Sequence, residues 1–338
     1  MKDFPRLWKK TKIIHKRAFS FLTHYRFEIV YGGSVVFFVF LVFLLNSINL
    51  SLQREVSGKQ VLLTPFVQKP QAVYPIIRKT VLGISSSALP PFYVSAKASI
   101  IMDNDSKAIL FAKNENTTFS LASTTKIMTA LVALDYFNPK DKLTVFSENI
   151  EGAVVGIKMG DTFYFEDLLY GMLLPSGNDA AITIADNYPG GKEAFVRKMN
   201  EKAKSLYLFN THFSDPAGLE DEGDYSTPKD LAMLASIGLK NNTFSQIVKT
   251  KQKVITDVSG KTTYSVRNLN KLLDIAGITG IKTGFTEVAG EVLVTSKVEE
   301  GHTIIIVVMK SKDRFMDTKQ LLDSISNTIF YKTFSTEF

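Results

Sequence analysis

A run of 22 uncharged residues, from position 29 to position 50, is the strongest hydrophobic feature of the 338-residue chain. At ~1.5 Å per residue a helix of this length extends about 33 Å, enough to cross a hydrocarbon core of ~30 Å. Eight basic residues lie just before it, and positive charge stays on the cytoplasmic side of a membrane. We therefore expect a basic cytoplasmic tail over 1–28 and a transmembrane anchor over 29–50.

A cleaved signal peptide is the alternative explanation of this apolar run. Signal peptides have an apolar region of about 7–15 residues that ends in a small-x-small cleavage site. The run here is longer, and residues 46–53 offer no clear site of that kind. We expect an uncleaved, single-pass anchor in the cell membrane, with the N-terminus in the cytoplasm and the rest of the chain outside.

Beyond the anchor, the pattern predicts a stalk and then a folded domain. Residues 51–90 contain four prolines and show neither helical nor strand periodicity, so we expect an extracytoplasmic stalk. From 91 to 332 the spacing of apolar residues predicts a folded domain of strands and helices. The predicted strands are 98–103, 108–113, 253–257, 262–266, 279–284, 291–297 and 303–309. The predicted helices are 121–134, 165–174, 178–187, 191–206, 228–239 and a last one from Phe315 to about Tyr331.

The order of these elements predicts an α/β (α+β) fold. Two strands come first, a helical region follows, and further strands and a final helix close the domain. A sheet is then completed by parts of the chain that are far apart in sequence, and a helical lobe is inserted between them.

The formal net charge of +7 is concentrated at the N-terminus. Residues 1–28 carry eight basic and two acidic side chains, a net +6, which leaves +1 for the rest. The folded part lacks the basic surplus typical of nucleic-acid binding, so we expect no nucleic-acid partner. The chain has no cysteine, and its four histidines are scattered. We expect neither a metal ion nor a cofactor.

Three short motifs supply the candidate chemistry. They are, in order, Ser123 with Lys126, Ser176 with Asn178, and Lys282 with Thr283 and Gly284. A second Ser-x-x-Lys pattern, at Ser226 and Lys229, has a structural explanation, because Thr227 and Pro228 are typical of a helix start. The order and local context of the three motifs point to one site.

The first motif predicts a serine nucleophile with a lysine base. Helical spacing places Lys126 one turn after Ser123, on the same face. A serine hydroxyl attacks a carbonyl only after a base takes its proton, and lysine is a base only when it is neutral. Burial and a neighbouring cation lower a lysine pKa, and Lys282 is the predicted cation.

The other two motifs predict assisting groups. Ser176 is expected to relay a proton between the base and the departing amine, and Asn178 to orient the lysine and the substrate amide. Lys282 and Thr283 are expected to hold a substrate carboxylate, and Gly284 to let the strand backbone approach the ligand. Together these residues predict a serine acyl-transfer enzyme.

At these motifs the chain resembles the low-molecular-mass penicillin-binding proteins, specifically the serine D-alanyl-D-alanine carboxypeptidases of peptidase family S11. The resemblance extends over about residues 91–332. Further segments that carry it begin at Asp215 (DPAGL), Tyr225 (YST), Arg267 (RNLN) and Gly280 (GIKTGFT).

The resemblance implies a penicillin-binding-protein/β-lactamase-like transpeptidase fold, an antiparallel sheet with flanking helices and an all-helical lobe. It implies that Ser123 attacks the carbonyl between the terminal D-alanines of a peptidoglycan stem pentapeptide. The backbone N–H groups of Ser123 and Phe285 would form the oxyanion hole. β-Lactams would acylate the same serine.

Three other functions stay open from the sequence. An endopeptidase that cuts wall cross-links would use the same motifs. A class A β-lactamase would add a glutamate that activates the deacylating water, and Glu193, Glu201 and Glu220 lie in no context typical of it. A silent wall-binding or antibiotic-sensing protein would have no need of the complete catalytic set.

Overall fold

The computed structural model describes residues 73–77, 93–325 and 329–333. The predicted tail (1–28) and membrane anchor (29–50) lie outside this part of the chain. Among the residues that the structure describes, no helix is both long and apolar enough to cross a membrane.

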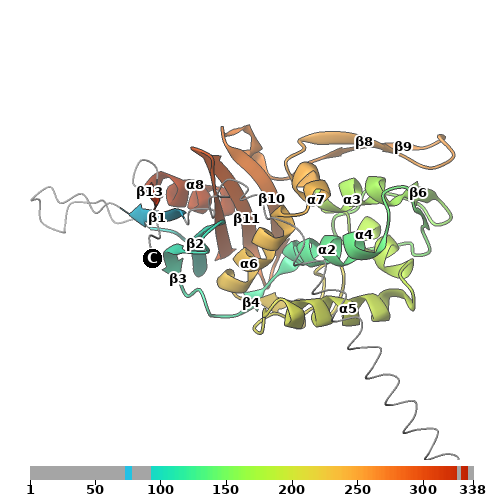
Figure 1. The fold of residues 1–338 in the computed structure, drawn as a ribbon. Coiled ribbons are helices and arrows are strands. Elements are labelled where there is room, and N and C mark those ends of the chain that lie inside the picture. Colours follow the sequence, from blue (N-terminus) through green and yellow to red (C-terminus); the bar gives the residue numbers. More distant parts are fainter. Residues whose placement is uncertain (1–72, 78–92, 326–328, 334–338) are drawn as a thin grey trace, which may run out of the picture. The chain divides into compact units, whose positions relative to one another are not determined.

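A five-stranded antiparallel sheet forms one layer of the domain, with strand order β10-β11-β12-β2-β3. Its members are β2 (Ala98–Asp103), β3 (Ile109–Lys113), β10 (Ile278–Thr286), β11 (Gly290–Glu299) and β12 (His302–Ser311). The first two strands come from the start of the domain and the other three from its end (Figure 1). This arrangement confirms the prediction of a sheet completed by distant segments.

Both faces of the sheet are covered, and the strand sequences explain why. In β12 the side chains of Ile304, Ile306 and Val308 pack in one core with Leu321 of α8 (Arg314–Ile325). The alternate residues of the same strand belong to a second core, shared with the helical lobe. Because successive side chains of a strand point to opposite faces, a strand buried on both sides reads as a continuous apolar run.

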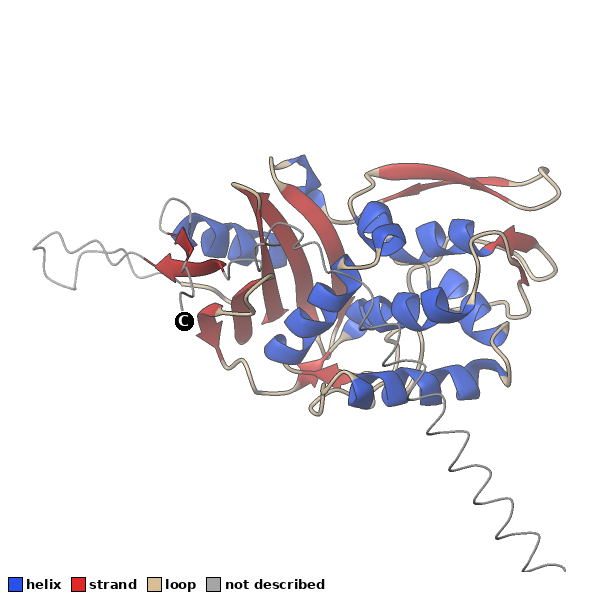
Figure 2. Cartoon of the chain, in the orientation of Figure 1, coloured by secondary structure: helices blue, strands red, loops and turns tan. Residues whose placement is uncertain are grey.

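The helical lobe is inserted between β3 and β10 in the sequence. Figure 2 shows its helices in blue beside the red strands of the sheet. Its helices are α2 (Lys126–Tyr136), α3 (Phe165–Leu173), α4 (Asn178–Asp186), α5 (Gly191–Ser205), α6 (Pro228–Leu239) and α7 (Asn242–Val248). Short hairpins flank them: β5 (Lys142–Thr144) with β6 (Thr162–Tyr164), and β8 (Gln252–Thr256) with β9 (Thr263–Arg267). Two-residue strands β4 (Phe119–Ser120) and β7 (Tyr225–Ser226) also pair. The predicted helical lobe is therefore confirmed.

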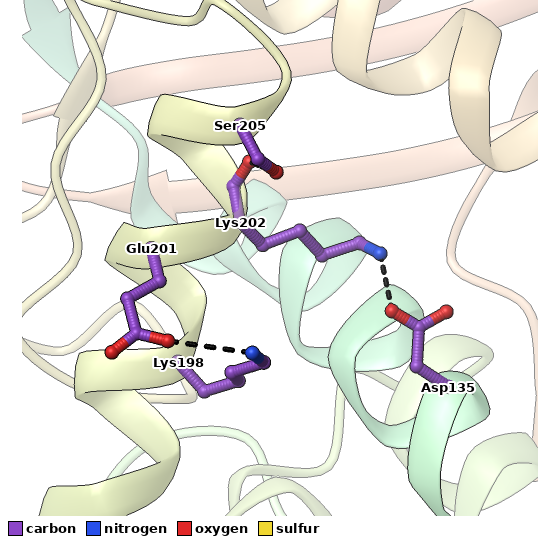
Figure 3. A network of polar contacts seen from close by, with 5 residues as sticks. All are labelled: Asp135, Lys198, Glu201, Lys202 and Ser205. Atoms are coloured by element: carbon purple, nitrogen blue, oxygen red, sulfur yellow. Dashed lines mark hydrogen bonds and ion pairs between the residues drawn. The ribbon is translucent and has the colours of Figure 1, made fainter. Parts of the chain in front are cut away.

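An ion pair links two helices of the lobe at its surface. Lys202 of α5 lies 2.5 Å from Asp135 of α2, and Lys198 lies 3.3 Å from Glu201 on the same side of α5 (Figure 3). The Asp135 side chain is 61% exposed, so water screens the pair. Such exposed pairs contribute about 0.2–1 kcal/mol, and the buried apolar residues hold the lobe together.

The start of α6 is as predicted. Thr227 is the N-cap, its side chain accepts a hydrogen bond from Asp230 N at 3.1 Å, and Pro228 is in the first turn. The second Ser-x-x-Lys pattern therefore serves a helix start, as its sequence indicates.

The end of the domain differs from the prediction. A single helix to about Tyr331 is wrong, because α8 ends at Ile325 and β13 (Ile329–Thr333) follows. β13 pairs antiparallel with β1 (Val73–Ile77), which lies in the stretch predicted as a stalk. Each of these short strands is formed by pairing with a segment more than 250 residues away, and local periodicity does not reveal such a partner.

Candidate active site

Ser123 lies in a 3₁₀ helix, η1 (Ala122–Thr125), and Lys126 opens α2 directly after it. The sequence predicted one continuous helix here. The tighter turn brings the two side chains together, with Lys126 Nζ 2.9 Å from Ser123 Oγ. The hydroxyl and the amine of the first motif are therefore in hydrogen-bond contact.

Lys126 is fully buried, and its amine has two further contacts. Nζ lies 2.7 Å from Asn178 Oδ1 and 2.5 Å from the carbonyl oxygen of Ala217. Both partners are acceptors only at these atoms, so the amine must donate to each. A charged lysine would donate to Ser123 Oγ as a third contact. In the neutral form its two N–H groups serve these two acceptors, and the lone pair faces the hydroxyl of Ser123. The contact set fits the uncharged form that a general base needs.

Burial lowers the pKa of Lys126 to about 7. Three carboxyl groups oppose this shift when they are ionised: Asp215, Asp224 and Asp179. We predicted that Lys282 lowers the pKa of Lys126, but burial is the main cause. Repulsion between the two lysines acts on Lys282, whose pKa is held well below its usual value by burial first and by Lys126 and Arg314 next.

The turn that supplies the Ala217 carbonyl is a part of the site that motif reasoning missed. Asp215 organises it, since its two carboxylate oxygens accept four backbone N–H bonds from residues 217–220 at 2.5–2.8 Å. Gly218 has φ +82°, and a Cβ there would lie 1.9 Å from the carbonyl oxygen of Ala122. Only glycine lets this turn pack directly against η1. The DPAGL segment was one of those that carry the resemblance to the family, but the sequence did not reveal that its turn contacts the lysine and η1.

Ser176 and Asn178 stand at the start of α4. Ser176 has φ 67° and is 3% exposed, and its Oγ has no hydrogen-bond partner among the described residues. Asn178 accepts from Lys126 and donates through Nδ2 to Glu151 O at 2.7 Å. The predicted contact between the asparagine and the lysine is present, and the Ser176 hydroxyl remains available.

Asp179 fixes the loop beside Asn178 and was not singled out in the sequence. Its carboxylate accepts hydrogen bonds from the backbone N–H groups of Val155, Gly156 and Ile157 at 2.8–3.2 Å. Asn178 N donates to Ala153 O at 2.7 Å. A negative side chain in the first turn of α4 also interacts favourably with the helix dipole.

The third motif lies on β10, the edge strand of the sheet. A Cβ on Gly284 would meet Leu121 O at 3.1 Å and Ser123 N at 3.2 Å, so the strand backbone touches η1 at the predicted nucleophile. Lys282 and Thr283 are buried, and Lys282 Nζ donates to the Thr283 carbonyl oxygen at 2.9 Å. Phe285 is 60% exposed. The three motifs therefore meet at one place.

Arg314, at the start of α8, is another residue that the sequence analysis missed. Its Nη1 donates to the Gly284 carbonyl oxygen at 2.8 Å, and its charge is one of the causes that lower the pKa of Lys282. It adds positive charge beside the predicted carboxylate-binding residues. Within the described part of the chain, no group of acidic and histidine side chains is placed to hold a metal ion.

Comparisons with known proteins give the family of this chain. The D-alanyl-D-alanine carboxypeptidase family model (Peptidase_S11) matches residues 85–313. The crystal structure of the Streptomyces K15 DD-transpeptidase aligns with a TM-score of 0.66 at 34% identity, over 68% of this chain and 97% of that one.

Curated relatives carry related names. D-alanyl-D-alanine carboxypeptidase DacF of Bacillus subtilis is 31% identical over 68% of this chain and 61% of its own length. A D-alanyl-D-alanine carboxypeptidase of Streptomyces is 37% identical over 64% of this chain and 81% of its own. A D-alanyl-D-alanine endopeptidase of Escherichia coli is 33% identical over 75% and 81%. The chain therefore belongs to the D-alanyl-D-alanine carboxypeptidase family, peptidase family S11, and has its penicillin-binding-protein-like α/β fold.

Proposed function

We propose that this protein is a serine D-alanyl-D-alanine carboxypeptidase that removes the terminal D-alanine from peptidoglycan stem pentapeptides. The observation that carries the proposal is the contact of 2.9 Å between Lys126 Nζ and Ser123 Oγ, made by an amine whose other two contacts are both acceptors. A buried amine with a pKa of about 7 can take the hydroxyl proton at neutral pH.

In the acylation step, Ser123 Oγ attacks the carbonyl carbon between the two D-alanines while Lys126 accepts the hydroxyl proton. The backbone N–H groups of Ser123 and Phe285 stabilise the oxyanion. The proton passes through the Ser176 hydroxyl to the leaving nitrogen, and the C–N bond breaks. The buried Oγ of Ser176, which has no hydrogen-bond partner within the described ranges, supports this role, because it can donate and accept in turn.

The positively charged side chains of the site bind the substrate. Lys282 and Thr283 hold the terminal carboxylate of the pentapeptide, and the charge of Arg314 adds to theirs. An incoming carboxylate favours the charged form of Lys282, because an opposite charge nearby raises a lysine pKa. Asn178 accepts a hydrogen bond from the base, Lys126, and forms a hydrogen bond with the substrate amide.

Deacylation completes the reaction. Water attacks the carbonyl carbon of the Ser123 ester, and its hydroxyl becomes part of the free carboxyl group of the tetrapeptide stem. The ester C–O bond breaks, and the other proton of the water goes to the serine oxygen. A penicillin opens its lactam ring on Ser123 in the same way and remains as an ester. We therefore also propose covalent binding of β-lactams at this residue.

Release of D-alanine from a defined stem pentapeptide is the test. The wild-type protein should release it, and Ser123→Ala should lose both turnover and labelling by a fluorescent penicillin while keeping its melting temperature. Retained turnover in Ser123→Ala would remove this serine as the nucleophile. Labelling without any D-alanine release would favour an antibiotic sensor.

An endopeptidase is the second candidate, because a relative of similar identity carries that name. The two activities differ in the leaving group, which is free D-alanine in one case and a cross-linked stem in the other. A cross-linked muropeptide dimer offered beside the pentapeptide separates them. Cleavage of the dimer alone would replace the carboxypeptidase proposal.

We propose further that residues 29–50 anchor the enzyme in the cell membrane, with residues 1–28 in the cytoplasm and the catalytic domain outside. The 22-residue uncharged run and the basic segment before it support this placement. Of the predicted stalk, residues 51–72 then lie between the anchor and β1 in the sequence.

A further inference from the structure

Asp224 is a fully buried carboxyl group behind the base, and the proposed mechanism does not use it. Its Oδ1 accepts a hydrogen bond from Ser214 N at 2.8 Å. Its Oδ2 is buried, and no donor among the described residues reaches it. A buried ionised oxygen without a donor is costly, so this arrangement needs an explanation.

The group that Asp224 meets is the carboxyl of Asp215. Each of the two Asp215 oxygens already accepts two backbone N–H bonds, and these four bonds stabilise Asp215 as an anion. Two carboxylates cannot bond to each other, but a carboxylic acid can donate to a carboxylate. Burial and the contact with Asp215 raise the pKa of Asp224 to about 9, and the hydrogen bonds hold the pKa of Asp215 below its usual value.

We infer that Asp224 is a positioning residue, which donates a shared proton to Asp215 and so holds the 215–220 turn against the base and the nucleophile. The inference rests on the proposed acyl-enzyme function.

The backbone connects this acid pair to both reacting groups. Ala217 O, in the turn that Asp215 organises, accepts from Lys126 Nζ at 2.5 Å, and Pro216 O accepts from Thr129 Oγ1 at 2.6 Å. On the other side, the carbonyl oxygen of Asp224 accepts from Leu121 N at 3.0 Å, two residues before Ser123. Movement of the pair would therefore shift the lysine and the serine together.

The protonated acid also limits the negative charge beside the base. The charged groups around it are Asp215 on the turn and Lys126 on α2, and Asp179 of α4 also acts on that lysine. Ionisation of Asp224 would place a second negative charge near Lys126 and raise its pKa. It would also repel Asp215 and loosen the turn. The loosened turn lowers the acylation rate at alkaline pH.

The test compares Asp224→Asn with wild type. An amide can donate to Asp215 through its N–H group and accept from Ser214 N, and it does not ionise. The rate constant for acylation by saturating penicillin is measured from about pH 5 to pH 10, a window that spans the reference values of a carboxyl group and a lysine. Asp135→Asn, which removes an exposed carboxylate from the same helix as Lys126, is the matched control.

Wild type and the control should show a decrease in rate above a pKa of about 9. Asp224→Asn should keep the neutral-pH rate within about threefold of wild type and lose that decrease, whereas Asp224→Ala should lose about 10- to 100-fold through misplacement of the base. A decrease that persists in Asp224→Asn would assign it to another group, such as Lys282, and overturn the inference. Failure of Asp224→Asn to fold would count against it as well.

A readout without activity separates this inference from the proposed function. In protein labelled at the aspartate carboxyl carbon, NMR should show one carboxyl group that titrates near pH 9 and is missing in Asp224→Asn. If no variant is acylated, the proposed function fails and the titration still tests the acid pair. If acylation is normal and no such carboxyl group titrates, the inference alone fails.

Discussion

At the scale of single residues, the site depends on how the Lys126 amine is coordinated. A lysine in water is an ammonium ion with three donors, and it cannot serve as a base. Here burial removes the solvation that favours the charge, and Asn178 and Ala217 each take one N–H group. The position of two acceptors therefore decides where the lone pair points.

Replacement of Asn178 tests this coordination. Asn178→Ala removes the acceptor at 2.7 Å from Lys126 Nζ and the donor to Glu151 O. We expect the acylation rate constant to fall about 10²-fold, because the base loses its orientation. Stopped-flow measurement with a fluorescent penicillin gives this rate constant.

Asn187→Ala is the matched control at the other end of α4. Asn187 accepts from Thr144 N at 3.1 Å and donates to Thr144 O at 2.8 Å, away from the three motifs. This variant should lose about 1–3 kcal/mol of stability and keep its acylation rate. Equal loss of rate in both variants would show that Asn178 acts only through the fold.

At the scale of elements, close packing of backbones sets the distances in the site. The 215–220 turn and β10 both press on η1, and a glycine lies at each contact. A side chain at either glycine would separate the element from the nucleophile. These contacts join segments that lie about one hundred residues or more from η1 in the sequence.

Gly218→Ala tests the turn contact. Its Cβ would lie 1.9 Å from Ala122 O, and its φ of +82° disfavours alanine. We expect loss of stability of more than about 1–2 kcal/mol, the usual cost of the left-handed conformation, together with loss of acylation. Thermal unfolding and penicillin labelling measure the two effects.

Gly301→Ala is the control for backbone strain alone. Its φ is also +82°, and a Cβ there meets no atom within 4 Å. It should cost about 1–2 kcal/mol of stability and leave acylation unchanged. If Gly218→Ala acylated as fast as Gly301→Ala, the turn would have no role in positioning η1.

Local pattern sufficed for some elements and failed for others. The start of α6 was predictable because Thr227, Pro228 and Asp230 act within one turn. The contact of Ser123 with Lys126 was predictable from their spacing. The roles of Asp215, Asp179 and Arg314 were not, because each binds backbone groups of another segment or of a loop with no periodicity. β13 was missed for a similar reason, since its partner β1 lies at the far end of the domain.

At the scale of the whole molecule, the family and the class of serine hydrolase that the motifs predicted are confirmed by the comparisons. The three motifs come from a 3₁₀ helix, the start of α4 and an edge strand, and only the complete fold brings them together. The sheet places β10 at its edge, where the helical lobe can reach it (Figure 1).

Retention of the N-terminal segment is the prediction for the whole chain. If residues 29–50 anchor the enzyme, the mature protein should keep its N-terminus and sediment with membranes until detergent is added. Intact-mass measurement of the purified protein decides this. A mature chain that begins after residue 50 would mean that the apolar run is a cleaved signal.

The pH dependence of Ser123 acylation by a saturating penicillin tests most directly whether a neutral Lys126 is the base. Saturation removes the effect of pH on ligand binding, so the rate reports the protonation state of the base. The acid limb of the profile should rise with an apparent pKa of about 7, as burial of Lys126 requires. A rate that rises only near ~10.4, the value for lysine in water, would contradict the account.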